Sequence, residues 1–202
     1  MNHADAIWIG ADPGGKGNFG LAILQNDGMA QAWCVSCADE ALKLVQRYAK
    51  TSSPSGVGVD APLWWSSGPS SDRRVDQWLR KTYGLSGGQV QAVNSLRGAA
   101  LAQGMIFVQR IREVFPTLPV TETHPNAVLK AMKLDGDSFY ERFSIKVSHN
   151  SKHERDAVIS AVAAREGFSG RWKNDLSINR DASEQDPLKF WLAPVKYLWP
   201  EE

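Results

Sequence analysis

Residues 6–35 read AIWIGADPGGKGNFGLAILQNDGMAQAWCV, and this stretch does most to set the architecture. Apolar and β-branched residues dominate 6–12, 19–24 and 30–35, a composition that predicts three strands. The turn at 13–18 is rich in glycine, and Asn26-Asp27-Gly28 is a typical hairpin signal. Three strands joined by such short turns form an antiparallel meander, with Asp12 at the end of the first strand.

The next segments extend this meander into a mixed sheet. Apolar residues recur at helical spacing between Asp39 and Lys50, and Val57-Gly58-Val59-Asp60 then reads as a short buried strand. In a strand, hairpin, helix, strand order, the fourth strand can lie parallel to the first. This arrangement places Asp12 and Asp60 side by side, each at a strand end.

The remaining chain predicts further helices and one more strand. A helix capped by Ser71 or Asp72 should run to Gly84, and the other expected elements are a helix at 95–115, a strand at 120–122, a short helix at 126–132 and a last helix at 151–166. We therefore expect an α/β fold whose five-stranded mixed sheet, with its first three strands antiparallel, is flanked by helices. Residues 1–170 should form one domain, and residues 171–202 an extension packed on it as irregular structure or a late hairpin.

Composition sets broad limits. With 202 residues, 43% hydrophobic and 22% charged, the chain suits one substantial soluble domain. No apolar run approaches the roughly 18 residues of a membrane span, and the N-terminus lacks the pattern of a secretory signal, so we expect a cytoplasmic protein without a membrane partner. The net charge of +1 neither indicates nor excludes a nucleic-acid partner, and oligomeric state is not predicted.

Cys34 and Cys37 are the two cysteines of the chain. A structural zinc site needs four good ligands, and there is no second cysteine pair to supply them. We expect two reduced cysteines packed as small apolar residues near a strand end.

Four acidic residues are candidates for catalysis. Asp12, Asp60 and Glu122 fall at predicted strand ends, and Asp156 lies on the small-residue face of the last helix, where a buried carboxylate needs a partner. Taken alone, Asp12 and Asp60 also fit ordinary turns, and Glu122 also fits a solvated strand edge. Glu154 and Arg155 are expected to face water. Gathered carboxylates repel one another unless a cation or proton relieves them, and Mg²⁺ or Mn²⁺ prefers all-oxygen ligands. Together they predict a two-metal site for phosphodiester cleavage.

Basic and aromatic residues are candidates for substrate binding. A phosphate-binding rim on the 72–84 helix, with tryptophans on which bases stack, would comprise Arg73, Arg74, Arg80 and Lys81 beside Trp64, Trp65 and Trp78. The alternative is an amphipathic helix with a solvated basic face and core tryptophans. Lys16 either approaches a phosphate or stays solvated. His153 is a candidate for substrate binding or proton transfer, whereas His124, before Pro125, more often serves a structural role.

The order of these motifs resembles a known superfamily. Asp12-Pro13-Gly14 after the first strand, an acid after the fourth, and His153-x-x-Asp156-Ala157 on the last helix are similar to the RNase H-like superfamily, including RuvC-type resolvases. A family of unknown function, predicted to be RNase H-fold nucleases, is similar over about residues 6–167. It resembles this chain in Asp60-Ala61-Pro62, Arg74-x-Asp76-x-x-x-Arg80, Glu122-x-His124-Pro125 and Asp156-Ala157. The longer first loop and the Trp64-Trp65 pair depart from the pattern.

The resemblance implies an RNase H-like fold and a function. Asp12, Asp60 and Asp156 would bind Mg²⁺ or Mn²⁺, Glu122 would assist, and the substrate would be DNA or RNA. The alternatives are a non-catalytic nucleic-acid-binding or scaffold module and an actin-like nucleotide-binding phosphotransferase. The latter normally needs a second, duplicated half that 202 residues can hardly supply.

Overall fold

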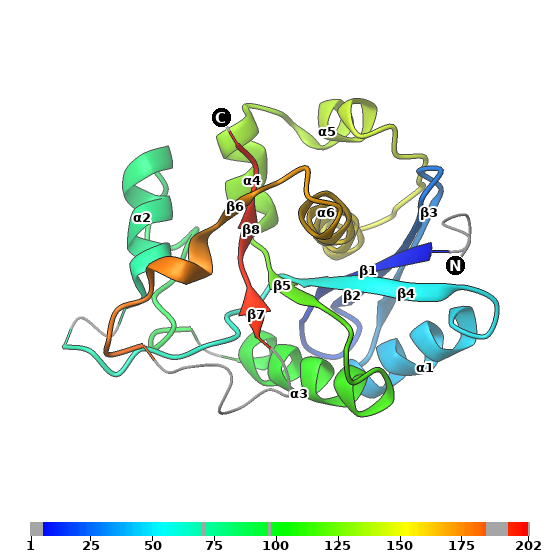
Figure 1. Ribbon diagram of the computed structural model, residues 1–202, viewed down its shortest axis with the longest axis horizontal. Helices are drawn as coiled ribbons and strands as arrows, with labels where there is room; N and C mark the ends of the chain where they lie inside the picture. Colours follow the sequence, from blue (N-terminus) through cyan, green and yellow to red (C-terminus); the bar gives the residue numbers. More distant parts are fainter. Residues whose placement is uncertain (1–5, 70–71, 97, 185–193, 202) are drawn as a thin grey trace.

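The computed structural model describes residues 6–69, 72–96, 98–184 and 194–201 (Figure 1). Its centre is a mixed sheet with strand order β3-β2-β1-β4-β5-β7. The strands are β1 (Ala6–Asp12), β2 (Phe19–Gln25), β3 (Ala30–Val35), β4 (Ser53–Val59), β5 (Val120–Glu122) and β7 (Val195–Lys196).

The predicted antiparallel meander is confirmed. β1 pairs with β2 and β2 with β3, both antiparallel, and Gly28 turns the second hairpin with a φ of 88°. β4 runs parallel to β1 and β5 parallel to β4, with Ala11 opposite Val59 and Val59 opposite Glu122. The carboxyl ends of β1, β4 and β5 therefore meet at one edge of the sheet.

The sheet has six strands in the described ranges, one more than the five predicted. The sixth, β7, comes from the C-terminal tail and lies parallel to β5. A second tail strand, β8 (Leu198–Trp199), pairs antiparallel with β6 (Asn174–Asp175). Strands of two residues are too short to show alternation, and for this reason periodicity did not reveal them.

Most helices fall where the sequence predicts them. They are α1 (Ala38–Tyr48), α2 (Arg74–Tyr83), α3 (Ala99–Val114), α4 (Pro125–Met132), α5 (Gly136–Arg142) and α6 (Lys152–Phe168), with a 3₁₀ turn η2 (Leu176–Asn179). Gly84, with a φ of 62°, ends α2 as predicted, but the N-cap residue is Arg73 and not Asp72; Ser71 lies outside the described residues. α5 was not predicted, and α3 begins four residues later than expected. None of the helices described is long and apolar enough to cross a bilayer.

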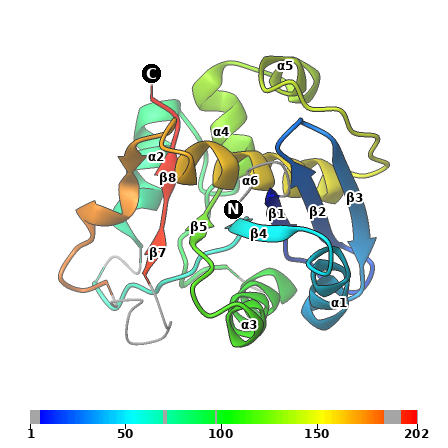
Figure 2. The ribbon, with the colours of Figure 1, turned by 45° about the vertical axis from the view of Figure 1, so that its right-hand side comes forward.

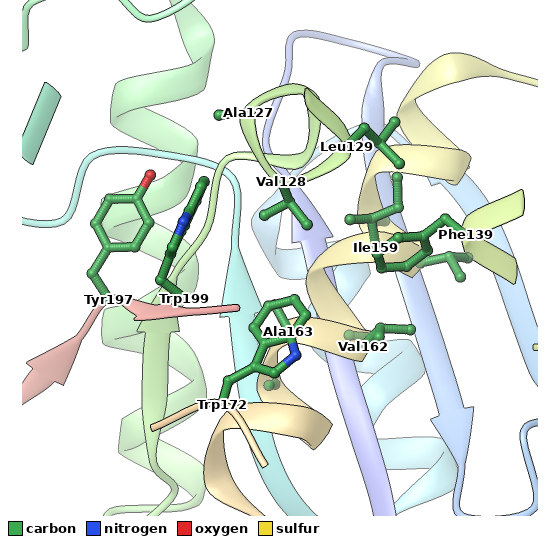
Figure 3. Packing of buried hydrophobic residues seen from close by; sticks show 14 of the residues in the cluster. Ala127, Val128, Leu129, Phe139, Ile159, Val162, Ala163, Trp172, Tyr197 and Trp199 are labelled. Atoms are coloured by element: carbon green, nitrogen blue, oxygen red, sulfur yellow. The ribbon is translucent and has the colours of Figure 1, made fainter. Parts of the chain in front are cut away.

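The helices form a layer on each face of the sheet. In Figures 1 and 2, α1 and α3 cover one face, while α6, with α4 and α5 above it, covers the other. β1 serves both layers, because Ile7 and Ile9 belong to the apolar cluster on the α1 and α3 side and Trp8 to the cluster on the α6 side. Figure 3 shows the α6 side, where residues of α4, α5, α6 and the C-terminal tail pack together: Val128, Phe139, Ile159, Val162, Trp172 and Trp199.

Two glycines let α6 lie directly on the sheet. A Cβ atom added to Gly10 of β1 would lie 1.8 Å from the backbone oxygen of Ala157, and one added to Gly58 of β4 would lie 2.0 Å from that of Ser160. Both distances are far below any real contact, so only glycine fits at these two positions. This close approach carries the first turns of α6 over the ends of β1 and β4.

Candidate metal centre

The structure brings Asp12, Asp60 and Asp156 together. Asp12 is the last residue of β1, Asp60 directly follows β4, and Asp156 lies in the second turn of α6. Each offers a carboxylate oxygen, and these oxygens all lie within 4.8 Å of one another. The backbone N–H of Asp60 donates to the carbonyl of Ala11, which fixes the two strand ends against each other.

Burial and the neighbouring negative charges raise the pKa values of Asp12 and Asp60. Burial raises the pKa of Asp12 to about 6, with the Asp156 charge adding to the rise and His153 opposing it. The pKa of Asp60 is raised well above its ordinary value by burial and then by the charges of Asp12, Asp156 and Glu122. Within the described ranges, no protein donor makes a hydrogen bond to the Asp60 side chain. Asp60, which has two other carboxylates beside it and no such donor, favours an external cation or a proton.

Two neighbouring side chains hold the outer carboxylates in place. His153 Nδ1 lies 2.6 Å from Asp12 Oδ2. Arg155 donates to Asp156 Oδ1 from Nε at 2.9 Å and from Nη2 at 2.6 Å, and Nη2 also donates to the Asn126 side chain at 3.2 Å. His153 thus contacts a candidate ligand directly, in the position where a proton-transfer or positioning residue is useful.

The expectation that Glu154 and Arg155 face water is wrong. Glu154 is buried, and its Oε2 accepts a hydrogen bond of 2.5 Å from the backbone of Asn150. Arg155 is mostly buried, engaged with Asp156. Both residues lie at the start of α6, which packs against the sheet and against α4. The helix is therefore buried on more than the one face that its apolar stripe predicts.

Glu122 lies outside the three-acid group. Its two oxygens accept from Arg73 Nη1 at 2.8 Å and Arg73 Nη2 at 2.6 Å, and one of them also accepts from the backbone of Leu63 at 2.9 Å. Arg73 also donates to both oxygens of Asp76, at 2.8 Å each. Glu122 acts on the site through its charge, because that charge helps to raise the pKa of Asp60.

Arg73 is therefore not part of an exposed phosphate rim. It is fully buried between Glu122 and Asp76 and stacks on Trp64, with Cζ 4.4 Å from the ring centroid. Burial alone would lower the pKa of Arg73, but the two carboxylates outweigh it and raise that pKa, so the guanidinium stays charged. A sequence cannot show that the first of two adjacent arginines faces inward, because it precedes the helix whose periodicity would orient it.

The other predicted basic residues lie in different settings. Arg80 donates to the carbonyl of Val90 at 2.8 Å and pairs with Asp72, so it holds the loop after α2. Arg74 lies on the exposed face of α2, and Lys16 is exposed in the loop between β1 and β2. None of Lys16, Arg74 and Arg80 lines the cavity beside the three acids.

A cavity of about 200 Å³ opens beside the acids. Its walls come from the strand ends, the start of α2 and the loop at 88–96, and they include Asp12, Asp60, Asp76, Gln89 and His124. Burial lowers the pKa of His124, which favours a neutral ring, and its Nδ1 has no hydrogen-bond partner among the described residues. Sequence reasoning missed the loop at 88–96, because its Gly-Gly-Gln composition carries no periodic signal.

The donor set fits a hard divalent cation. All three converging side chains offer carboxylate oxygens, the ligands that Mg²⁺ and Mn²⁺ prefer, and two of them have raised pKa values that a bound cation would reverse. Asp12, Asp60 and Asp156 are the residues that would hold it. Comparison of the chain with protein-family models, characterised proteins and solved structures finds no match.

Proposed function

We propose that this protein is a Mg²⁺- or Mn²⁺-dependent nuclease of the two-metal-ion class, with DNA or RNA as its substrate and an RNase H-like fold. The observation that carries the proposal is the convergence of Asp12, Asp60 and Asp156 within 4.8 Å at the carboxyl ends of parallel strands. When bound, the ions would supply an activated water and stabilise the leaving oxygen.

The protein's own residues position this chemistry. Asp12, Asp60 and Asp156 hold the cations, His153 orients Asp12, and Arg155 orients Asp156. His153 is partly exposed, so its ring can exchange protons with solvent while it contacts Asp12. The cavity beside Asp60 gives a substrate group room next to the reacting phosphate.

The test combines metal binding with a substrate screen. The purified protein is titrated with Mg²⁺ or Mn²⁺, and labelled single-stranded, duplex, hybrid and branched substrates are assayed for cleavage. We expect a melting temperature that rises with metal concentration and cleavage of at least one substrate class. Asp60→Asn should abolish cleavage and remove the metal-dependent rise, because it removes the acid with the fewest protein partners.

Asp39→Asn is the matched control, since Asp39 is an exposed acid in the first turn of α1. It should leave both properties unchanged. A non-catalytic nucleic-acid-binding or scaffold module predicts no metal-induced stabilisation and no cleavage, whereas ATP binding in calorimetry would instead favour an actin-like phosphotransferase. The nuclease proposal is rejected if the wild type shows neither metal-induced stabilisation nor cleavage, or if it binds ATP. It is also rejected if Asp60→Asn keeps the cleavage and the metal-dependent rise of the wild type.

A further inference from the structure

A surface groove of about 490 Å³ runs between α2 and the 3₁₀ turn η2, away from the acid cluster. Val75 and Leu176 give it an apolar floor, and Trp78 lines it from the exposed face of α2. Arg74 and Lys81 line the same groove. Arg74, Trp78 and Lys81 recur at spacings of four and three residues, which places them on one stripe of α2.

Trp78 is an exposed aromatic ring held in a fixed orientation. Its side chain is among the large apolar groups left in solvent, at 38% exposure. Tyr83 meets it edge to face at 5.6 Å between ring centroids, and Trp199 does so at 6.3 Å. These contacts limit the rotation of the indole, so a planar ligand would stack on it at little cost in side-chain entropy.

Two exposed cations flank this ring along the helix. Arg74 and Lys81 lie seven residues apart, about 10 Å along the helix axis at 1.5 Å per residue, with Trp78 between them. The ion pair of Arg74 with Asp181 is 3.9 Å long and open to solvent, so it competes weakly with a ligand. A flat ring between two positive charges matches an aromatic base that carries phosphates on both sides.

The same helix forms a wall of the acid site. Asp76, on the opposite face of α2, and Arg73, just before it, line the cavity that contains Asp12 and Asp60. α2 and the residue before it therefore contribute to both the acid-site cavity and the groove. The bases of a duplex are already stacked on one another, whereas the bases of a single strand are free to stack on Trp78.

We infer that the α2 groove binds single-stranded nucleic acid, with a base stacked on Trp78 and neighbouring phosphates contacting Arg74 and Lys81. This inference rests on the proposed function, since it assigns single strands, or the unpaired arm of a branched molecule, as the substrate class. Because the groove lies outside the acid cluster, its binding can be measured without metal and without cleavage.

The experiment measures fluorescence anisotropy of a labelled twelve-residue oligothymidylate, titrated with the full chain in EDTA. The double variant Arg74→Glu/Lys81→Glu should weaken binding about tenfold or more, and Trp78→Leu should weaken it by a similar factor, whereas Trp78→Phe retains most of the affinity. The matched control is Lys43→Glu/Arg47→Glu, which makes the same charge change on the exposed face of α1. Its affinity is measured over a range of salt concentrations, which separates the effect of net charge. After this correction, the α1 variant should bind the oligonucleotide as the wild type does.

Three outcomes would overturn the inference. The first is that the groove variants bind as tightly as the wild type, and the second is that the α1 control weakens binding equally. The third is that a twelve-base-pair duplex, or an acidic, aromatic peptide of equal charge, binds as well as the single strand. The measurement in EDTA separates this inference from the nuclease proposal, because it needs neither metal nor cleavage. A wild-type chain that binds the oligonucleotide through the groove but cleaves no substrate with Mn²⁺ rejects the nuclease alone, whereas cleavage by a chain whose groove variants bind as the wild type does rejects this inference alone.

Discussion

Asp12 couples pH to stability at this site and, under the proposed function, would couple both to metal binding. Its pKa is raised from 3.8 to about 6, so the folded protein holds a proton that the unfolded chain releases between these two values. Bound protons then favour the folded state at low pH, and this stabilisation is lost as the pH rises from about 4 to about 6. Above that range, a cation held by the same oxygens would take the place of the proton.

We therefore predict opposite pH trends with and without metal. Without metal, the free energy of unfolding of the wild type, measured relative to that of Asp12→Asn, should fall between pH 4 and pH 6 and then level off. With Mg²⁺ or Mn²⁺, the apparent affinity should fall about tenfold for each pH unit below 6, because one proton competes with the metal. Denaturant titrations across this range and calorimetric metal titrations measure the two trends, and a flat metal affinity contradicts the assignment of Asp12 as a ligand.

Arg73 stabilises the fold beneath the acid site. It pairs with both Glu122 and Asp76 in a fully buried position. Arg73→Met should lower the free energy of unfolding by about 3–5 kcal/mol, because both buried carboxylates lose the cation with which they pair. Urea denaturation checks this, and Arg74→Met, on the exposed face one residue on, should change stability by less than about 0.5 kcal/mol.

A triple variant tests the physical reason for this loss. Arg73→Met/Asp76→Leu/Glu122→Leu removes all three charges, and apolar replacements of buried ion networks are often neutral or stabilising. It should therefore recover most of the stability lost in Arg73→Met. If it is as unstable as the single variant, packing rather than unpaired charge explains the loss.

At the scale of elements, the sequence predicted the helices and strands that carry a periodic pattern or a turn signal and missed the short elements that carry neither. The meander, the parallel fourth strand and helices such as α1, α2 and α6 carry strong periodicity or turn signals, and each lies close to its predicted range. α5 and the two-residue strands β6, β7 and β8 are too short for such signals. Asp12 and Asp60 were predictable because parallel strands end at the same edge, and Asp156 because a carboxylate on the small-residue face of the last helix needs a partner. The inward turn of Arg73 and the burial of Glu154 depend on tertiary packing.

The contact of α6 with the sheet joins fold and site at this scale. Gly10→Ala would place a methyl group against the Ala157 carbonyl and push α6, with Asp156, away from Asp12. We expect a loss of about 1–3 kcal/mol in stability and at least a tenfold weaker metal affinity. Thermal melts with and without Mn²⁺ measure both.

The control for this helix displacement is Gly87→Ala. Gly87 has no atom within 4 Å of an added Cβ and no left-handed backbone, so the substitution should leave stability and metal affinity unchanged. Unchanged metal affinity in a folded Gly10→Ala variant would show that Asp156 does not need the close approach of α6.

At the scale of the whole molecule, the described part of the C-terminal tail (residues 171–202) contributes to the sheet and to the hydrophobic core. β7 extends the sheet beside β5, and the backbone of Leu198 donates to the Thr121 side chain at 2.9 Å. Tyr197 and Trp199 are buried side by side (Figure 3), with the Trp199 indole donating to the Tyr83 hydroxyl at 2.9 Å. The tail therefore connects the sheet edge to α2, which carries both the cavity wall and the groove.

Truncation after Gly170 tests whether residues 1–170 suffice as a folded unit. Removing the tail would expose the edge of β5 and the apolar surface that Trp172, Tyr197 and Trp199 cover, so we expect loss of the cooperative thermal transition and aggregation. Trp199→Ala gives the quantitative form of the test, with an expected loss of about 3–5 kcal/mol in the full chain. Deletion of residues 201–202 is the control and should leave the melting temperature unchanged, because Glu201 is exposed. A truncated chain that melts cooperatively near the wild-type temperature, and still gains stability from Mn²⁺, would show that the acid site needs only the first 170 residues.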